Sequence, residues 1–188
     1  MAKLVSKTYG DALFELAVES NQTDVYLEEA KMVSSILEKN DELNRLMNHP
    51  KIVKEEKIKI VESIFKGRIS DELTGLLCML VEKDHYKETV SVLDFLISEI
   101  KEYKQIGTAY VISAMPLNEI QKSNIVDKLL ETTDYVKFEM NYEVDPSLIG
   151  GMIIRIKDRV VDSSIKTKLA SLSLELSKIQ LKVGEYSP

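Results

Sequence analysis

The sequence predicts a mainly α-helical protein, in which a six-helix bundle over residues 1–106 is followed by a small α+β domain over residues 107–181. Apolar residues recur at helical spacing through the first half, which holds three of the seven glycines and one of the four prolines. The second half is richer in both, and its segment 136–144 alternates strictly between apolar and polar residues. Strict alternation is typical of a half-buried strand. At 188 residues the chain is long enough for one domain or two small ones.

Each helix of the first half is indicated by a periodic apolar face that is followed by a break. Thr23 is expected to cap the second helix and Ser70 the fifth, because a hydroxyl can accept a bond from a free backbone N–H. Pro50 ends the third helix, since the residue before a proline is driven out of the helical region, and Gly67 ends the fourth. The expected helices cover residues 5–17, 23–37, 43–47, 53–65, 70–81 and 90–103.

The second half is predicted to form a β-α-β-β(β)-α unit. Its last helix carries apolar residues at alternating steps of four and three, and residues 182–188 are expected to form a flexible tail. The expected elements are a strand over 108–112, a helix over 117–130, a strand over 136–144, a hairpin of 152–156 with 160–161, and a helix over 165–179.

The composition favours a protein that binds or builds over one that catalyses. The net charge is −6, and residues 1–105, with 15 basic and 20 acidic side chains, account for −5 of it. A nucleic-acid-binding protein needs a basic surface, so we expect no nucleic-acid partner. Two histidines and one cysteine cannot form an internal disulfide or a thiolate–imidazole metal cluster. We therefore expect no metal and no cofactor.

The chain shows no sign of a targeting or membrane-spanning segment. Its N-terminus lacks the apolar core of a secretory signal, and it reaches Asp11 and Glu15 too early for a transit peptide. The longest apolar run, residues 76–81, is far shorter than the roughly 20 residues that cross a bilayer. We expect a soluble cytoplasmic protein that reaches a membrane only through a partner.

Two helices carry more apolar surface than one buried stripe needs. Phe14 and Val18 lie outside the stripe of the first helix, and the fifth is apolar all round from Leu76 to Val81. Such a helix is either buried on all sides or shared between its own core and a partner helix, and both interpretations stay open. A charged substitution at Leu80 separates them, because it weakens binding in one case and unfolds the bundle in the other. The candidate groove residues are Tyr9, Ala12, Leu13, Leu16, Ala17, Leu76, Leu77, Met79 and Leu80.

Three segments carry a more specific pattern. VISAMPLNEIQ over residues 111–121 is followed by VDPSLIGGMIIRIKDRVVDSSIKTKL over 144–169, and the first helix reads YGDALFELA over 9–17. Together they resemble the delta subunit of bacterial F-type ATP synthase, which is called oligomycin-sensitivity-conferring protein in mitochondria. The resemblance covers residues 3–181, and the chain length and the order of the two domains agree with it.

The chemistry of this signature is structural. An Asp-Pro pair starts a turn, a glycine pair permits a positive φ or a close backbone approach before a buried strand, and Asp162 or the serines after it can cap the last helix. The family has glycine where Lys157 and Ser163 stand, so the resemblance does not fix the geometry of these two turns. The glycine pair leads into a strand and not into a helix with Lys-Ser/Thr, so no bound nucleotide is expected. The motif residues are Asp145, Pro146, Gly150, Gly151 and Asp162.

The resemblance implies a non-catalytic stator subunit. The bundle would bind the N-terminal helices of the alpha subunits on the catalytic head, and the α+β domain would hold the C-terminal ends of the b subunits of the peripheral stalk. This linkage would stop the head from turning with the rotor, so that proton flow is coupled to ATP synthesis. The subunit would lie at the cytoplasmic face of the bacterial cell membrane as a peripheral component. The rival interpretations are an unrelated helical protein-binding adaptor and an acidic enzyme with a site assembled from distant carboxylates.

Overall fold

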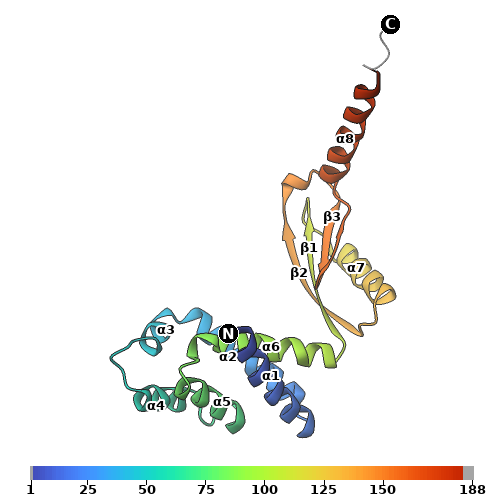
Figure 1. The fold of residues 1–188 in the computed structure, drawn as a ribbon. Coiled ribbons are helices and arrows are strands. Elements are labelled where there is room, and N and C mark those ends of the chain that lie inside the picture. The colour runs from blue at the N-terminus through green and yellow to red at the C-terminus, as the bar shows by residue number, and fades with distance from the viewer. Residues whose placement is uncertain (1, 184–188) are drawn as a thin grey trace. The chain divides into compact units, whose positions relative to one another are not determined.

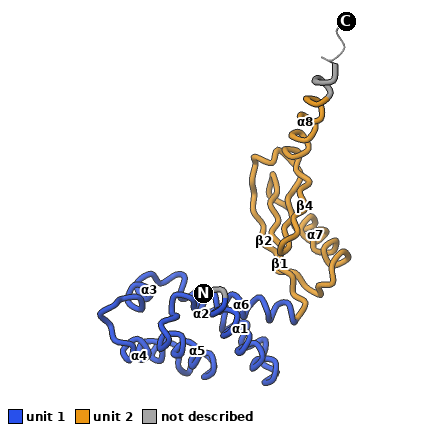
Figure 2. The backbone as a smooth tube through the Cα atoms, in the orientation of Figure 1, with its two compact units in different colours: residues 1–103 blue, residues 104–188 orange. Residues whose placement is uncertain are grey.

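The computed structural model describes the backbone of residues 2–183 and the burial of side chains 4–178. The chain separates into two compact units, residues 1–103 and residues 104–188 (Figure 2). From the sequence, this division was predicted after residue 106, whereas in the structure it lies at the end of the sixth helix.

Unit 1 is a bundle of six helices with one 3₁₀ turn (Figure 1). Helix α6 runs along both α1 and α2, and α4 packs against α5. Four side chains of α6, at helical spacing, are wholly buried: Val92, Leu93, Leu96 and Ile100. The elements are α1 (Ala2–Glu19), α2 (Thr23–Lys39), α3 (Asp41–Met47), α4 (Lys54–Phe65), α5 (Asp71–Glu82), η1 (Tyr86–Glu88) and α6 (Thr89–Tyr103).

Two local contacts determine how these helices meet. Gly10 lets α1 approach α6 closely, because a Cβ at this position would overlap the ring of Phe95. At the start of α5, the Glu29 carboxylate of α2 accepts the Ser70 backbone N–H at 3.0 Å and its hydroxyl at 2.6 Å. Ser70 is the N-cap residue, as predicted, but its hydroxyl bonds Glu29 and not the helix. Thr23 is the first residue of α2, whose N-cap is Gln22, so its predicted capping role is wrong.

Unit 2 is a four-stranded sheet with helices, in the strand order β2-β1-β3-β4. β1 and β2 are parallel, with Gly107 opposite Phe138, and the other two pairs are antiparallel. α7 lies against one face of the sheet (Figure 1). The elements are β1 (Ile106–Ser113), α7 (Glu119–Thr132), β2 (Lys137–Val144), η2 (Pro146–Leu148), β3 (Met152–Ile156), β4 (Arg159–Asp162) and α8 (Ile165–Val183).

The core of unit 2 forms where alternate residues of the strands meet α7. Ala109 and Val111 of β1 are wholly buried, and Ile125 and Leu129 of α7 pack with them and with Phe138. Asn118 and Gln121 exchange side-chain and backbone bonds at the start of α7, which forms a capping box.

The structure confirms the predicted fold class, a mainly helical N-terminal region followed by a small sheet domain. Lys157 has φ 50°, so it occupies the left-handed region that glycine favours, and this turn takes a glycine-like conformation although lysine stands there. The strand after the glycine pair, β3, was predicted to be buried, but the structure shows it half-buried. Its side chains are all partly exposed except that of Arg155, which is exposed. Of the predicted tail, residues 182 and 183 belong to α8, and residues 184–188 lie outside the described residues.

Candidate protein-binding surfaces

The nine groove candidates divide between the core and the surface of unit 1. Leu80 and Ala17 are wholly buried, so the core interpretation holds for them. Leu16 and Met79 are 37% and 46% exposed, and Ala12 is also exposed. Tyr9 is half-buried and packs against the core. The other buried candidates are Leu13, Leu76 and Leu77.

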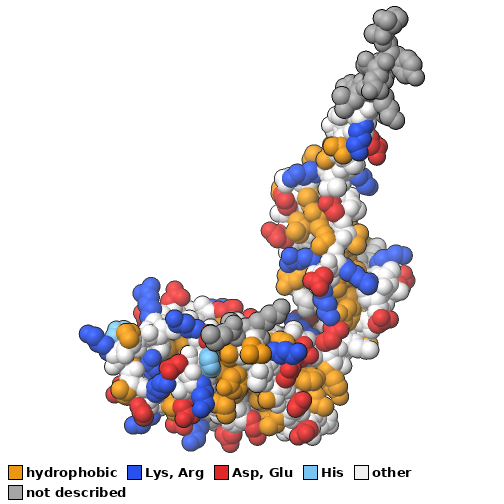
Figure 3. Space-filling view, in the orientation of Figure 1, with side chains coloured by type: hydrophobic (Ala, Val, Ile, Leu, Met, Phe, Trp, Pro, Cys, Tyr) orange, Lys and Arg blue, Asp and Glu red, His pale blue; other side chains and the backbone are white. Residues whose placement is uncertain are grey.

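The accessible candidates lie on two neighbouring helices. We define the α1–α5 surface as Tyr9, Ala12 and Leu16 of α1 with Gly75 and Met79 of α5. α1 and α5 contact each other, and Figure 3 shows hydrophobic side chains gathered where the two helices lie side by side in Figure 1. Residues 9, 12 and 16 follow helical spacing and fall on one flank of the buried face of α1.

Acidic side chains border this surface. Glu15 and Glu19 are exposed next to Leu16 on α1, and Glu72 and Glu82 are exposed on α5. Glu72 also bonds Tyr26, whose pKa is raised by burial and by the negative charge of Glu72. An apolar strip with carboxylates on both sides suits an amphipathic helix that carries basic residues along its edges.

Among the described residues, no side chain packs over Gly75. It lies in the interior of α5, is exposed, and has no neighbouring atom within 4 Å of the place a Cβ would occupy. A glycine in a helix interior costs about 0.5–1 kcal/mol relative to alanine. Gly75 is not among the candidates predicted from the sequence, although a glycine inside an apolar helix is a visible signal. The bare backbone is a place where another chain can approach α5 closely.

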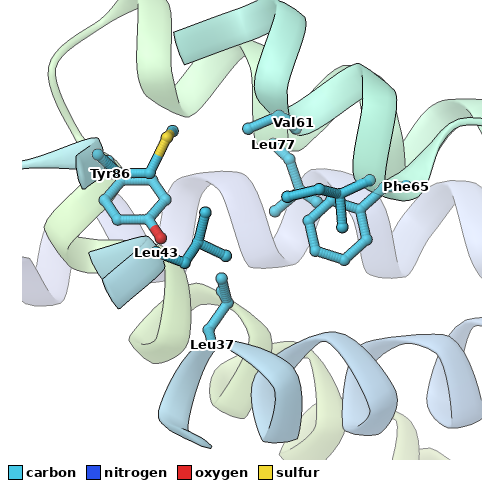
Figure 4. A pocket seen from close by; sticks show the side chains of 8 residues that line it. Leu37, Leu43, Val61, Phe65, Leu77 and Tyr86 are labelled. Atoms are coloured by element: carbon cyan, nitrogen blue, oxygen red, sulfur yellow. The ribbon is translucent and has the colours of Figure 1, made fainter. Parts of the chain in front are cut away.

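The interior of unit 1 also holds a small cavity of about 10 Å³ (Figure 4). Leu37, Leu43 and Phe65 are among its apolar lining residues. The Tyr86 hydroxyl in the lining donates to Asn44 Oδ1 at 3.1 Å, and burial raises the Tyr86 pKa to about 12. A cavity of this size holds one water at most, so it is a packing gap and not a ligand site.

In unit 2, the predicted signature residues hold the junction between the sheet and α8. Asp145 accepts the Ser147 N–H at 2.9 Å and precedes Pro146, which confirms the predicted turn. Gly151 has φ 77°, and a Cβ there would overlap the Ser163 carbonyl, so this position requires glycine. Gly150 has Ile165 packed against its open side, and its carbonyl accepts the Ile165 N–H at 2.9 Å.

Asp162 closes the junction from the other side. Its two carboxylate oxygens accept the Thr167 hydroxyl at 2.7 Å and the Ser164 N–H at 2.8 Å. These hydrogen bonds lower the pKa of Asp162, and those from Ser147 lower the pKa of Asp145. The Ser164 hydroxyl accepts the Thr167 N–H at 3.3 Å, so Ser164 caps α8 while Asp162 fixes the residues around it.

Unit 2 exposes apolar residues on two surfaces beyond this junction. On the sheet face away from α7, Arg155 lies 4.9 Å from the Tyr110 ring, in a shallow depression that Ile153 and Val160 also line. Along α8, every described side chain after Ser164 is exposed. Both surfaces are accessible to another chain, and their described residues form no group of His, Cys, Asp and Glu side chains that would suit a metal ion.

Within residues 2–183, no helix is long and apolar enough to cross a membrane. Among the side chains that the structure describes, His, Cys, Asp and Glu form no group of three that would suit a metal ion. The exposed apolar surfaces are instead typical of a protein whose partners are other protein chains.

An acidic helical bundle with an open apolar surface, followed by an α+β unit with an exposed amphipathic helix, defines a protein that connects other chains. The profile of the family described as ATP synthase delta (OSCP) subunit matches residues 5–176. The chain belongs to this family.

Individual relatives agree with this assignment. The ATP synthase subunit delta of Lachnoclostridium phytofermentans is 55% identical over 96% of this chain and 100% of its own length. The ATP synthase subunit delta of Halalkalibacterium halodurans is 33% identical over 92% of this chain and 94% of its own length. A chain in the cryo-EM structure of the Toxoplasma gondii mitochondrial ATP synthase hexamer has the same fold, with a TM-score of 0.74, 17% identity, and 91% and 96% coverage. Family membership makes this chain a non-catalytic stator subunit of ATP synthase, which confirms the role implied by the sequence.

Proposed function

We propose that unit 1 binds the N-terminal helices of the alpha subunits on the catalytic head, and that unit 2 binds the C-terminal ends of the b subunits. The stator role requires two attachments, one to the head and one to the peripheral stalk. The chain supplies two compact units, each with its own exposed apolar surface. In this arrangement the subunit is a peripheral component at the cytoplasmic face of the bacterial membrane.

The α1–α5 surface is the single observation that carries the attachment to the head. It is apolar along its centre, bordered by carboxylates, and opened by Gly75 to a close approach of another backbone. Unit 1 also carries most of the negative charge of the chain. An amphipathic helix with basic residues beside its apolar face complements each of these properties.

The test uses the full chain and a labelled synthetic peptide from the N-terminus of the alpha subunit of the same organism. Because the chain contains no tryptophan, the label on the peptide provides the fluorescence anisotropy signal. We expect binding at micromolar peptide concentrations or below. Met79→Glu places a charge on the α1–α5 surface and should weaken binding by at least about tenfold.

The matched control is Met32→Glu. Met32 on α2 and Met79 on α5 are each 46% exposed, so both substitutions add the same charge at the same degree of exposure. Met32→Glu should leave the affinity for the peptide unchanged. If the folded wild-type chain does not bind the peptide at micromolar concentrations, the proposed attachment to the head is refuted. If the two variants bind the peptide with equal affinity, the binding site is not on the α1–α5 surface.

A further inference from the structure

The apolar stripe of α8 is exposed over residues 165–178, the part of the helix whose side chains the structure describes. Ile165, Leu169, Leu172 and Leu176 are 42%, 52%, 53% and 61% exposed. Their spacing alternates between four and three residues, which places them on one side of the helix with the heptad period of a coiled coil. Ile179 and Val183 continue the spacing in the sequence. An isolated helix with this pattern leaves uncovered the surface that a second helix would cover.

The base of α8 shows a second feature of a docking surface. Ile149 has φ 68°, which is a strained conformation for a β-branched residue, and its side chain is 65% exposed. It adjoins Gly150, against which Ile165 packs at the start of the stripe. The chain therefore holds an isoleucine in solvent at a conformational cost, at the level where the stripe begins. Strain of this kind is found at sites with a binding role.

The charges beside the stripe select the occupant. On a helical wheel, Lys166 and Lys168 lie on the two sides of the stripe at the level of Ile165 and Leu169. Over residues 165–178 the helix carries three lysines and one glutamate, although the whole chain has a net charge of −6. Lys166 already donates to Ser147 Oγ at 3.4 Å and its charge acts on Asp145, so Lys168 is the charge that a partner would meet. A second copy of α8 would bring a second positive helix to Lys168, whereas a helix with acidic residues at this level would complement it.

We propose that α8 forms a two-helix, left-handed coiled coil with an acidic amphipathic helix of the peripheral stalk. The apolar stripe supplies the buried seam, and Lys168 pairs with an acidic residue of the partner. This proposal rests on the proposed binding of unit 2 to the b subunits, and it names the surface, the geometry and the charge of that contact.

The experiment measures binding of the full chain to the purified soluble segment of the b subunit from the same organism. Leu172→Asp places a charge in the stripe and should weaken binding by at least about tenfold. Leu174→Asp is the matched control, because Leu174 is 60% exposed and lies on the opposite side of the same helix. Lys168→Glu should also weaken binding, and more so at low ionic strength.

The outcomes separate this proposal from the function on which it rests. If the wild type and Leu172→Asp bind the b segment equally well, the coiled coil is overturned, while the stalk attachment stands. If the wild type does not bind the segment at all, the stalk attachment fails and the coiled coil fails with it. Sedimentation of the chain alone tests the remaining outcome. If the wild type is a dimer and Leu172→Asp is a monomer, a second copy of the chain occupies the stripe and the proposal is overturned. Circular dichroism checks that each variant keeps its helical content.

Discussion

Leu80 and Met79 are adjacent residues of α5 with opposite environments, and they allow the division between core and surface to be measured. Leu80 is wholly buried, whereas Met79 is 46% exposed. Replacing a buried leucine by alanine removes its transfer free energy and leaves a cavity, at a cost of about 2–5 kcal/mol. Met79→Ala removes a side chain that is already half in water, so the expected cost is about 1 kcal/mol or less.

The thermal consequence of Leu80→Ala follows from the size of the bundle. For a domain of about 100 residues, each kcal/mol of destabilisation lowers the Tm by roughly 4–8 °C. A loss of about 3 kcal/mol is a large part of the total free energy of unfolding of such a domain. It lowers the Tm of unit 1 by roughly 12–24 °C.

The assay is thermal and urea unfolding of the full chain, followed by circular dichroism, together with anisotropy of the labelled alpha-subunit peptide. We expect Leu80→Ala to lower the Tm strongly. Below that Tm, we expect it to leave the peptide affinity close to that of the wild type. Met79→Ala should do the reverse. If Leu80→Ala left the Tm unchanged and abolished binding, the assignment of Leu80 to the core would be wrong.

Three further predictions concern single positions. Gly75→Ala should raise the free energy of unfolding by about 0.5–1 kcal/mol in urea and weaken binding of the alpha-subunit peptide, and an unchanged affinity would show that no chain approaches α5 there. Glu29→Ala should lower the free energy of unfolding by about 1–2 kcal/mol, because it leaves the Ser70 N–H without its acceptor at the start of α5; a urea midpoint equal to that of the wild type would contradict this role. The pKa of Asp162 is lowered in the folded chain, so as the pH falls the unfolded state is protonated at Asp162 before the folded state is. The stabilisation by Asp162 is therefore complete above about pH 4, and it is lost as the pH falls through the folded pKa. Asp162→Asn should therefore reduce the dependence of the urea midpoint on pH between about pH 5 and 2, and equal slopes in the two proteins would refute this.

Local physical signals in the sequence were sufficient to predict most of the elements. A period of 3.6 residues indicated the helices of the bundle, and strict alternation at 136–144 indicated β2, because each pattern puts apolar side chains on one side of a regular backbone. Turn chemistry located the Asp145-Pro146 turn, since proline restricts φ and aspartate bonds the backbone ahead of it. The caps were less predictable, because the Ser70 hydroxyl donates to Glu29, which lies 41 residues away in the chain, and accepts no bond from the first turn of α5.

The sequence by itself determined the fold class, the family and the two helices with surplus apolar surface. It could not assign each apolar residue to the core or to a partner, because both environments select the same side chains. Only the tertiary structure separated Leu80 from Met79, and only the tertiary structure showed that Gly75 has nothing packed over it. The stripe of α8 was equally visible in the sequence as a spacing of four and three. That it is exposed follows from the short junction at Gly150 and Asp162, which fixes only the first turn of α8 and leaves the apolar side chains beyond it, up to residue 178, in solvent.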